Sequence, residues 1–178
     1  DIFTFILAAK IVLNVDKNIQ FVLIGRGSLE NVIQGKIDEL GLSSYIKIIN
    51  HLPNDILPEI LSNFDIYVST ALSDAGISAS TAEAMACELP VIITNVAEND
   101  KWISDGKNGY LFKAGNHNEL AHIIINLLKD QFEELYFIYL DKSNRDKTAE
   151  EKEQLRNMKI NSKIQEIFLP YMIYCRLH

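Results

Sequence analysis

Residues 20–29 read QFVLIGRGSL, and this stretch decides the fold class of the chain. Its first half is a short apolar run, typical of a strand buried on both faces of a parallel sheet. Gly25 and Gly27 follow at once. Apolar residues then recur at helical spacing from Leu29 to Leu40, and Gly41 ends the pattern as a helix-terminating glycine. A buried strand, a glycine turn and an amphipathic helix in this order form the repeating unit of α/β proteins.

The same alternation continues in both directions along the chain. The apolar spacing predicts helices over 2–14, 29–40, 58–63, 79–87, 100–104, 116–128, 131–140 and 151–168, and strands over 20–24, 45–49, 64–69, 90–94 and 110–113. Asn116 and Glu119 fit the N-cap residue of the helix over 116–128 and its partner three residues later. The sequence therefore predicts an α/β fold, a Rossmann-like parallel sheet with helices on both faces. Ligands bind at the carboxyl ends of the strands in such sheets, so the loops after the strands are the candidate sites.

The composition is that of a soluble globular domain. The chain has 178 residues, 48% of them hydrophobic, and a formal net charge of -7, which gives no support to a nucleic-acid partner. Two cysteines, Cys87 and Cys175, fit the cytosol better than an oxidising compartment. We find no apolar run long enough to cross a membrane and no signal peptide. The chain begins with Asp1 rather than methionine, so we expect residue 1 not to be the natural start.

The loop after the first predicted strand is the first candidate site. Gly25 and Gly27 allow the backbone to approach a ligand closely, and the helix that begins near Ser28 offers free N–H groups to an anion. A tight turn between strand and helix explains the same residues about equally well.

The loop after the strand at 64–69 is the second candidate. It is rich in small residues, which leave room for a phosphate or sugar above a helix N-terminus. Glu83, one turn into that helix, can accept two hydrogen bonds from ribose hydroxyls. However, the spacing Ser80-x-x-Glu83 also fits a capping box, in which Glu83 only holds the start of the helix.

Two further loops follow strands. Residues 50–55 include His51 and Leu52, whose backbone could meet the edge of a nucleotide base, although a histidine here is more often structural. Residues 95–100 could face the same edge or simply form a helix start. The histidines and cysteines show no metal-ligand spacing, so we expect no metal site.

These segments together are similar to a known family. Residues 2–129 resemble the C-terminal, nucleotide-sugar-binding domain of the retaining glycosyltransferases group 1, which have the GT-B fold. The resemblance lies in four stretches, 21–29 (FVLIGRGSL), 65–70 (DIYVST), 83–92 (EAMACELPVI) and 102–112 (WISDGKNGYLF).

The resemblance implies roles for several residues of the second loop. Glu83 matches the second of two family glutamates and would bind the ribose of the donor. The first falls at Ala75, so either Asp74 or the backbone N–H groups of Gly76, Ile77 and Ser78 would hold the donor sugar. Glu88 stands where the family has a glycine, and a left-handed conformation there would cost about 1 kcal/mol.

The family domain also begins with a strand that is followed by an arginine and a lysine for the donor diphosphate. We assign no residue to these two roles, because the chain begins within the next helix. The absent strand is the central one in the order 3-2-1-4-5-6. We therefore expect a partial chain with exposed sheet edges. We divide it into an N-terminally truncated Rossmann-like domain, 1–140, and a charged linker with a C-terminal helical segment, 141–178, and assign no element to the apolar tail after Pro170.

The implied activity is retaining transfer of a hexose from a nucleotide-diphosphate sugar to an acceptor hydroxyl in glycan biosynthesis. The implied partners are the nucleotide-sugar donor and a glycan or lipid-linked acceptor that an N-terminal domain holds. No further cofactor is implied. The implied location is the cytoplasm, with membrane association only through the rest of the protein. This fragment alone is expected to be inactive. A non-catalytic nucleotide-sugar-binding or interaction module and a nucleotide-sugar 2-epimerase are the alternatives.

Overall fold

The computed structural model describes residues 1–49, 52–53, 55–73, 77–143 and 171–176. The chain divides into two compact units. The first comprises Asp1–Ile124 together with Tyr171–His178, and the second comprises Ile125–Pro170. The sheet and every described candidate residue belong to the first unit. The fold is therefore described for that unit by itself.

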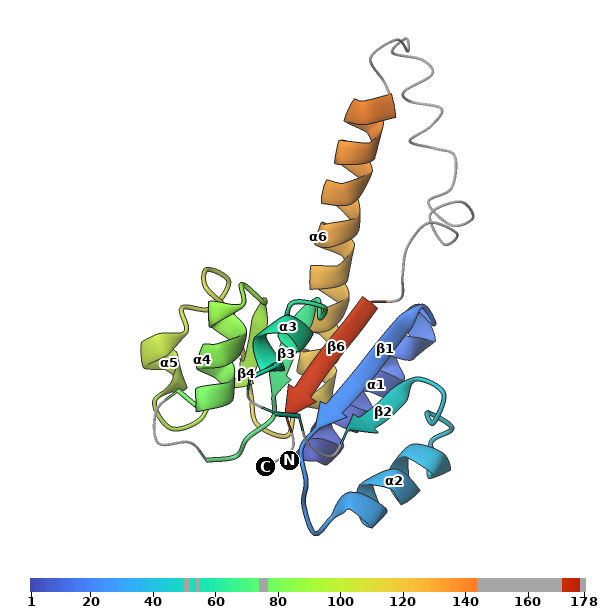
Figure 1. Cartoon of the computed structure of the whole chain (residues 1–178), viewed down its shortest axis with the longest axis vertical. Coiled ribbons are helices and arrows are strands. Elements are labelled where there is room, and N and C mark those ends of the chain that lie inside the picture. Colours follow the sequence, from blue (N-terminus) through green and yellow to red (C-terminus); the bar gives the residue numbers. More distant parts are fainter. Residues whose placement is uncertain (50–51, 54, 74–76, 144–170, 177–178) are drawn as a thin grey trace. The chain divides into compact units, whose positions relative to one another are not determined.

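The first unit is built on a six-stranded sheet in the order β2-β1-β6-β3-β4-β5, in which all pairings are parallel (Figure 1). The strands are β1 (Ile19–Ile24), β2 (Ile46–Ile49), β3 (Ile66–Ser69), β4 (Val91–Thr94), β5 (Tyr110–Phe112) and β6 (Tyr171–Arg176). The prediction of a parallel α/β sheet, and of its first five strands to within two residues at each end, is confirmed.

The centre of the sheet differs from the sequence-based expectation. We predicted that the position between β1 and β3 would be empty and would leave exposed edges. Instead, β6 lies there and pairs with both neighbours. The tail after Pro170, to which the sequence analysis assigned no element, therefore forms a strand in its described part rather than a helix. The expected helix over 151–168 lies outside the described residues.

The helices are α1 (Ile2–Val15), α2 (Glu30–Glu39), α3 (Leu57–Leu61), α4 (Ala79–Ala86), α5 (Asn99–Trp102) and α6 (His117–Ser143). The two predicted helices after Asn116 are one continuous helix, α6. Its start is capped as predicted, because Glu119 N donates to Asn116 Oδ1 at 3.2 Å and Asn116 Nδ2 donates to Glu119 Oε2 at 3.0 Å. Gly41, with φ +69°, follows the end of α2 as expected.

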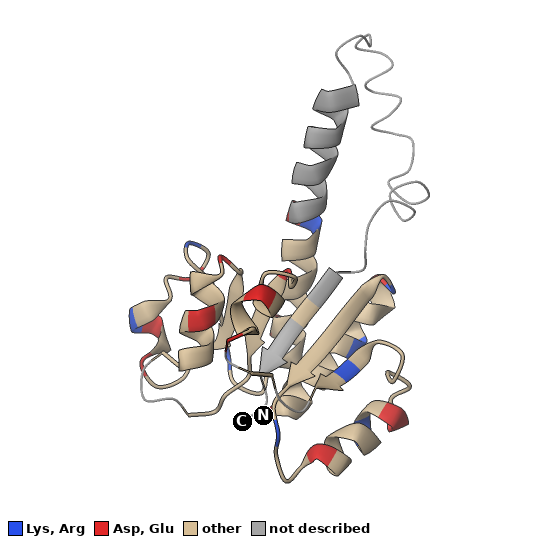
Figure 2. Cartoon of the chain, viewed as in Figure 1, with Lys and Arg blue, Asp and Glu red and all other residues tan. Residues whose placement is uncertain are grey.

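The core lies against the strands because their residues are apolar on both faces. Every residue of β3 and β4 is buried. Phe5 of α1 meets Phe21 of β1 edge to face, with ring centroids 5.6 Å apart and planes at 82°. Figure 2 shows most of the described charged residues on helices and loops, and β1, β3 and β4 contain no charged residue. The loops after β1, β3 and β4 thus follow strands that contain no charged residue.

The residue after α4 carries backbone strain that a substitution can relieve. Glu88 follows the C-cap residue Cys87 and has φ +61°, in the left-handed region. A Cβ atom is unfavourable there by about 1 kcal/mol, and the Glu88 side chain is exposed. We expect Glu88→Gly to raise the free energy of unfolding by about 1 kcal/mol in urea titrations. Glu88→Ala is the control, because it removes the carboxylate but keeps the Cβ. Equal stability of the two variants would contradict this account.

Candidate functional site

The candidate site is the carboxyl edge of the sheet. All six strands run parallel, so the loops that follow them emerge on this one side. The turn after β1 begins at Gly25, whose φ of +142° is readily adopted only by glycine. Gly25 N donates to Ile49 O at 2.9 Å and ties the turn to the end of β2. Gly27 and Ser28 are exposed at the edge, where a ligand can reach them.

The helix after this turn begins later than expected. α2 starts at Glu30, its N-cap residue is Leu29, and no side chain caps it. The N–H group of Glu30 already donates to Gly27 O at 3.2 Å. Ser28 therefore precedes the helix rather than capping it, and the exposed glycine turn is the feature that can approach an anion.

The loop after β2 is described only in part. His51 and Asn54 lie outside the described residues. Leu52 is half-buried and packs against the core cluster that includes Leu57 and Leu61. Leu52 is thus fixed by the core beside the end of β2, as a backbone contact to a nucleotide base would require.

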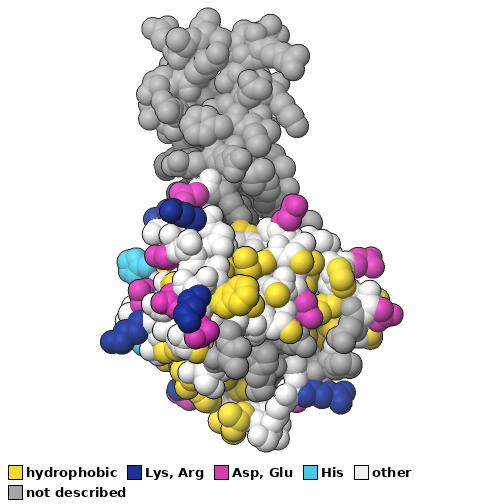
Figure 3. Space-filling view, turned by 90° about the vertical axis from the view of Figure 1, so that its left-hand side faces the viewer, with side chains coloured by type: hydrophobic (Ala, Val, Ile, Leu, Met, Phe, Trp, Pro, Cys, Tyr) yellow, Lys and Arg dark blue, Asp and Glu magenta, His cyan; other side chains and the backbone are white. Residues whose placement is uncertain are grey.

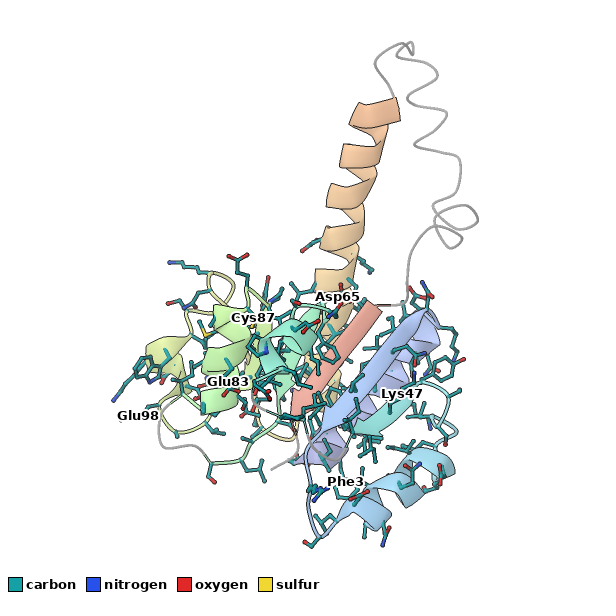
Figure 4. All side chains as sticks on the ribbon, viewed as in Figure 1. Phe3, Lys47, Asp65, Glu83, Cys87 and Glu98 are labelled. Carbon is teal, nitrogen blue, oxygen red and sulfur yellow. The ribbon has the colours of Figure 1, made fainter. Side chains whose placement is uncertain are left out.

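The start of α4 separates the two interpretations of Glu83. Ser78 is the N-cap residue, and its Oγ accepts a hydrogen bond from Thr81 N at 3.2 Å. The predicted capping box from Ser80 to Glu83 is therefore wrong at this helix, because the position three residues after the cap is Thr81. Glu83 lies beyond the first turn and is exposed on α4 (Figure 4). Its side chain is not needed as a helix cap.

The residues before α4 are described from Ile77 onward. Ile77 and Ser78 are both half-buried and lead directly into the helix. Asp74, Ala75 and Gly76 lie outside the described residues, so the choice between Asp74 and the backbone N–H groups as the sugar contact stays a prediction.

A buried network of hydroxyl groups fixes the start of α4 to the sheet. Tyr67 of β3 is fully buried, and its Oη lies 2.9 Å from Ser80 Oγ and 3.4 Å from Thr81 Oγ1. Ser78 Oγ in turn lies 3.2 Å from Ser80 Oγ and 2.8 Å from Thr81 Oγ1. The sequence analysis missed this role of Tyr67. The signal was a tyrosine inside a buried strand, which needs a partner for its hydroxyl.

Removing this hydroxyl is expected to loosen the start of α4. In Tyr67→Phe the buried hydroxyls of Ser80 and Thr81 lose their partner from the sheet, and stability should fall by about 1 kcal/mol. Chemical denaturation would measure this change, and amide exchange at α4 would show where it acts. Tyr45→Phe is the matched control, since Tyr45 is half-buried and contacts Lys17 through its ring. Equal losses in the two variants would argue against the network.

The loops after β3 and β4 are also joined. Thr94 Oγ1 donates to Ala71 O at 2.5 Å, and Asn99 Nδ2 donates to Thr94 O at 2.8 Å. Thr94 and Asn99 are 1% and 2% exposed. Asn99 Oδ1 is buried without a hydrogen-bond partner among the described residues. Buried hydrogen bonds thus hold the backbone on either side of the second loop, at Ala71 and at the start of α4.

One face of the molecule carries charges of both signs. On the face in Figure 3, acidic and basic side chains surround a group of apolar ones. Away from the loops, hydrogen bonds from Ser43 and Gln34 hold the pKa of the exposed Asp38 carboxyl below its ordinary value. In the described part of the chain, no cluster of three metal-ligating side chains occurs. None of the helices described is both long and apolar enough to span a membrane.

Comparison with known proteins gives this edge a context. The chain is 34% identical over 97 residues to the GtfA subunit of a UDP-N-acetylglucosamine–peptide N-acetylglucosaminyltransferase from Streptococcus gordonii, which covers 53% of this chain and 18% of that protein. The structure superposes on a TarM variant from S. aureus, solved with fondaparinux, alpha-GlcNAc-glycerol and UDP. The TM-score is 0.66 and the sequence identity is 27%. The match covers 72% of this chain and 26% of the TarM chain.

A third similarity concerns a domain of comparable size. The C-terminal domain of LpcC, a glycosyl transferase group 1 family protein from Francisella tularensis, matches with a TM-score of 0.64 and 25% identity, over 72% of this chain and 68% of that one. The chain thus spans about a fifth of the length of the GtfA subunit but most of this single domain. The model of the family "Glycosyl transferases group 1" matches residues 1–154. The chain therefore belongs to the glycosyl transferases group 1.

Proposed function

We propose that this chain is the donor-binding domain of a glycosyltransferase that transfers a hexose from a nucleotide-diphosphate sugar, with retention at the anomeric carbon. The observation that carries the proposal is the start of α4. There Ser78 caps the helix, the Tyr67 network fixes it, and Glu83 remains exposed one turn further on. A fixed helix start can hold an anion with its free N–H groups. An exposed carboxylate close to it can accept hydrogen bonds from a diol of the same ligand.

The other candidate residues are distributed around this helix. Glu83 would accept hydrogen bonds from the ribose hydroxyls, and Leu52 would place the backbone against the base. Gly25, Gly27 and Ser28 would approach the donor from the turn after β1. Backbone N–H groups from Gly76 to Ser78, or Asp74, would hold the sugar.

The chemistry follows from the charges. The bond between the anomeric carbon and the diphosphate oxygen breaks, and the diphosphate leaves with the electron pair. The acceptor oxygen forms the new bond on the same face, and its proton passes to the departing diphosphate oxygen. Stabilising the departing negative charge is the main demand on this domain. The acceptor, a glycan or lipid-linked hydroxyl, would be held by another part of the protein, and closure of the two parts would exclude water. We place this reaction in the cytoplasm.

The test is binding of UDP-, GDP- and ADP-sugars by calorimetry to the full-length protein. Glu83→Ala should weaken the preferred donor by about 1–3 kcal/mol, the energy of a lost polar contact. Glu88→Gln is the control, since it neutralises a carboxylate just past the opposite end of α4. If no donor binds to the folded protein, the proposal fails. Turnover with an acceptor distinguishes a transferase from a binding module, and interconversion of free nucleotide sugars would indicate an epimerase.

A further inference from the structure

The turn between α5 and β5 contains the one place in the chain where an asparagine precedes a glycine, Asn108–Gly109. Such a pair is chemically reactive, because glycine has no side chain to hinder an attack of its backbone nitrogen on the asparagine carboxamide. The attack closes a five-membered succinimide ring and releases ammonia. Asn108 is exposed. The proposed function gives neither residue a role.

The packing of the turn requires a glycine at position 109. Gly109 is buried, and a Cβ atom there would lie 2.7 Å from Val91 Cγ2 and 3.1 Å from Ile103 Cγ2. Non-bonded carbon atoms pack at about 3.5–4.0 Å, so even an alanine does not fit. The close contact that seats the turn on β4 therefore also leaves an unhindered peptide nitrogen directly after Asn108.

The side chain of Asn108 closes this turn. Its Oδ1 accepts a hydrogen bond from Ser104 N at 2.7 Å, and its Nδ2 donates to Trp102 O at 3.0 Å. On the other side of the reactive peptide, Gly106 N donates to Gly109 O at 2.9 Å. Cyclisation requires the carboxamide to leave its hydrogen bonds, because Nδ2 departs and the face of Cγ must turn to the Gly109 nitrogen. The closed turn therefore opposes the reaction.

We propose that Asn108–Gly109 is a deamidation site that the closed turn protects and that reacts when the turn opens. In the open turn, the bond between Gly109 N and Asn108 Cγ forms and the bond between Cγ and Nδ2 breaks. Nδ2 leaves as ammonia with the proton of the Gly109 amide. Water, the one co-reactant, then opens the succinimide at either carbonyl and leaves aspartate or isoaspartate at position 108. This chemistry does not depend on the proposed function.

The product cannot close the turn as the amide does. A carboxylate at position 108 still accepts from Ser104 N, but it has no proton to donate to Trp102 O, so two acceptors face each other. Isoaspartate also adds one carbon to the backbone next to Gly109, which packs closely against β4. The turn leads directly into β5, where Tyr110 pairs with Ile92. Deamidation is therefore a one-way change that loosens the β5 edge of the sheet.

The first test compares the folded chain with a synthetic peptide of residues 102–112 in the same mildly alkaline buffer. Peptide mapping by mass spectrometry gives the fraction of position 108 that has changed from amide to acid at each time. A turn that must open before it reacts should deamidate more slowly than the peptide, by about ten-fold or more. The chain unfolded in urea should react at a rate close to that of the peptide. Equal rates in the folded chain and the peptide would overturn the protection by the turn.

Asp105→Ala loosens the turn without changing the reactive pair. Asp105 Oδ1 accepts a hydrogen bond from Leu111 N at 2.9 Å and so ties the turn to β5. Loss of this bond should raise the deamidation rate of the folded chain by about two- to ten-fold, whereas the same substitution in the peptide should not. Lys107→Ala is the matched control, because it removes an exposed charged side chain from the same turn. No rise with Asp105→Ala, or an equal rise with Lys107→Ala, would contradict control of the reaction by the hydrogen bonds of the turn.

Asn108→Asp reproduces one product and tests whether the change is one-way. We expect amide hydrogen exchange in β5 to become about five- to ten-fold faster, because the turn loses the hydrogen bond to Trp102 O. Asn31→Asp is the matched control, since it makes the same chemical change at an exposed position in the first turn of α2 and should leave β5 unaffected. Unchanged exchange at β5 in Asn108→Asp would show that the product still closes the turn and would overturn the one-way change.

Discussion

Phe21→Ala is expected to lower the free energy of unfolding by about 3 to 5 kcal/mol. Phe21 is fully buried in β1, and its ring contacts the edge of Phe5 from α1. Its backbone is in register with Ile46 on one side and with Ile173 of β6 on the other. Truncation therefore leaves a cavity where α1, β1 and β6 meet, and a close-packed interior fills such a space only in part.

Urea or guanidinium denaturation of the folded chain would measure this loss. Val32→Ala is the control, because Val32 is 55% exposed on α2, and surface substitutions usually change stability by less than about 0.5 kcal/mol. Phe21→Leu should fall between the two, since it keeps most of the apolar volume. A loss below about 1 kcal/mol for Phe21→Ala would mean that α1 does not pack on β1 as described.

Local patterns were sufficient to predict most elements of the first unit. The run before Gly25 and the spacing from Leu29 to Leu40 report a strand and a helix directly, because burial on one or both faces imposes its period on neighbouring residues. The same holds for the cap formed by Asn116 and Glu119, whose two hydrogen bonds depend only on residues three apart.

The strand β6 could not be placed in this way. Its residues are apolar enough for a strand, but its partners in β1 and β3 lie more than 100 positions away in the chain. Local periodicity contains no information about such pairings. The family order of strands places the central strand before α1, whereas among the described residues the strand between β1 and β3 is β6.

The candidate site shows the same limit on a smaller scale. Ser78 and Ser80 are both good helix caps by residue type, and the spacing to Glu83 favoured Ser80. The structure uses Ser78, because the Ser80 hydroxyl is buried against Tyr67 of β3. A tertiary contact thus decides which serine caps the helix.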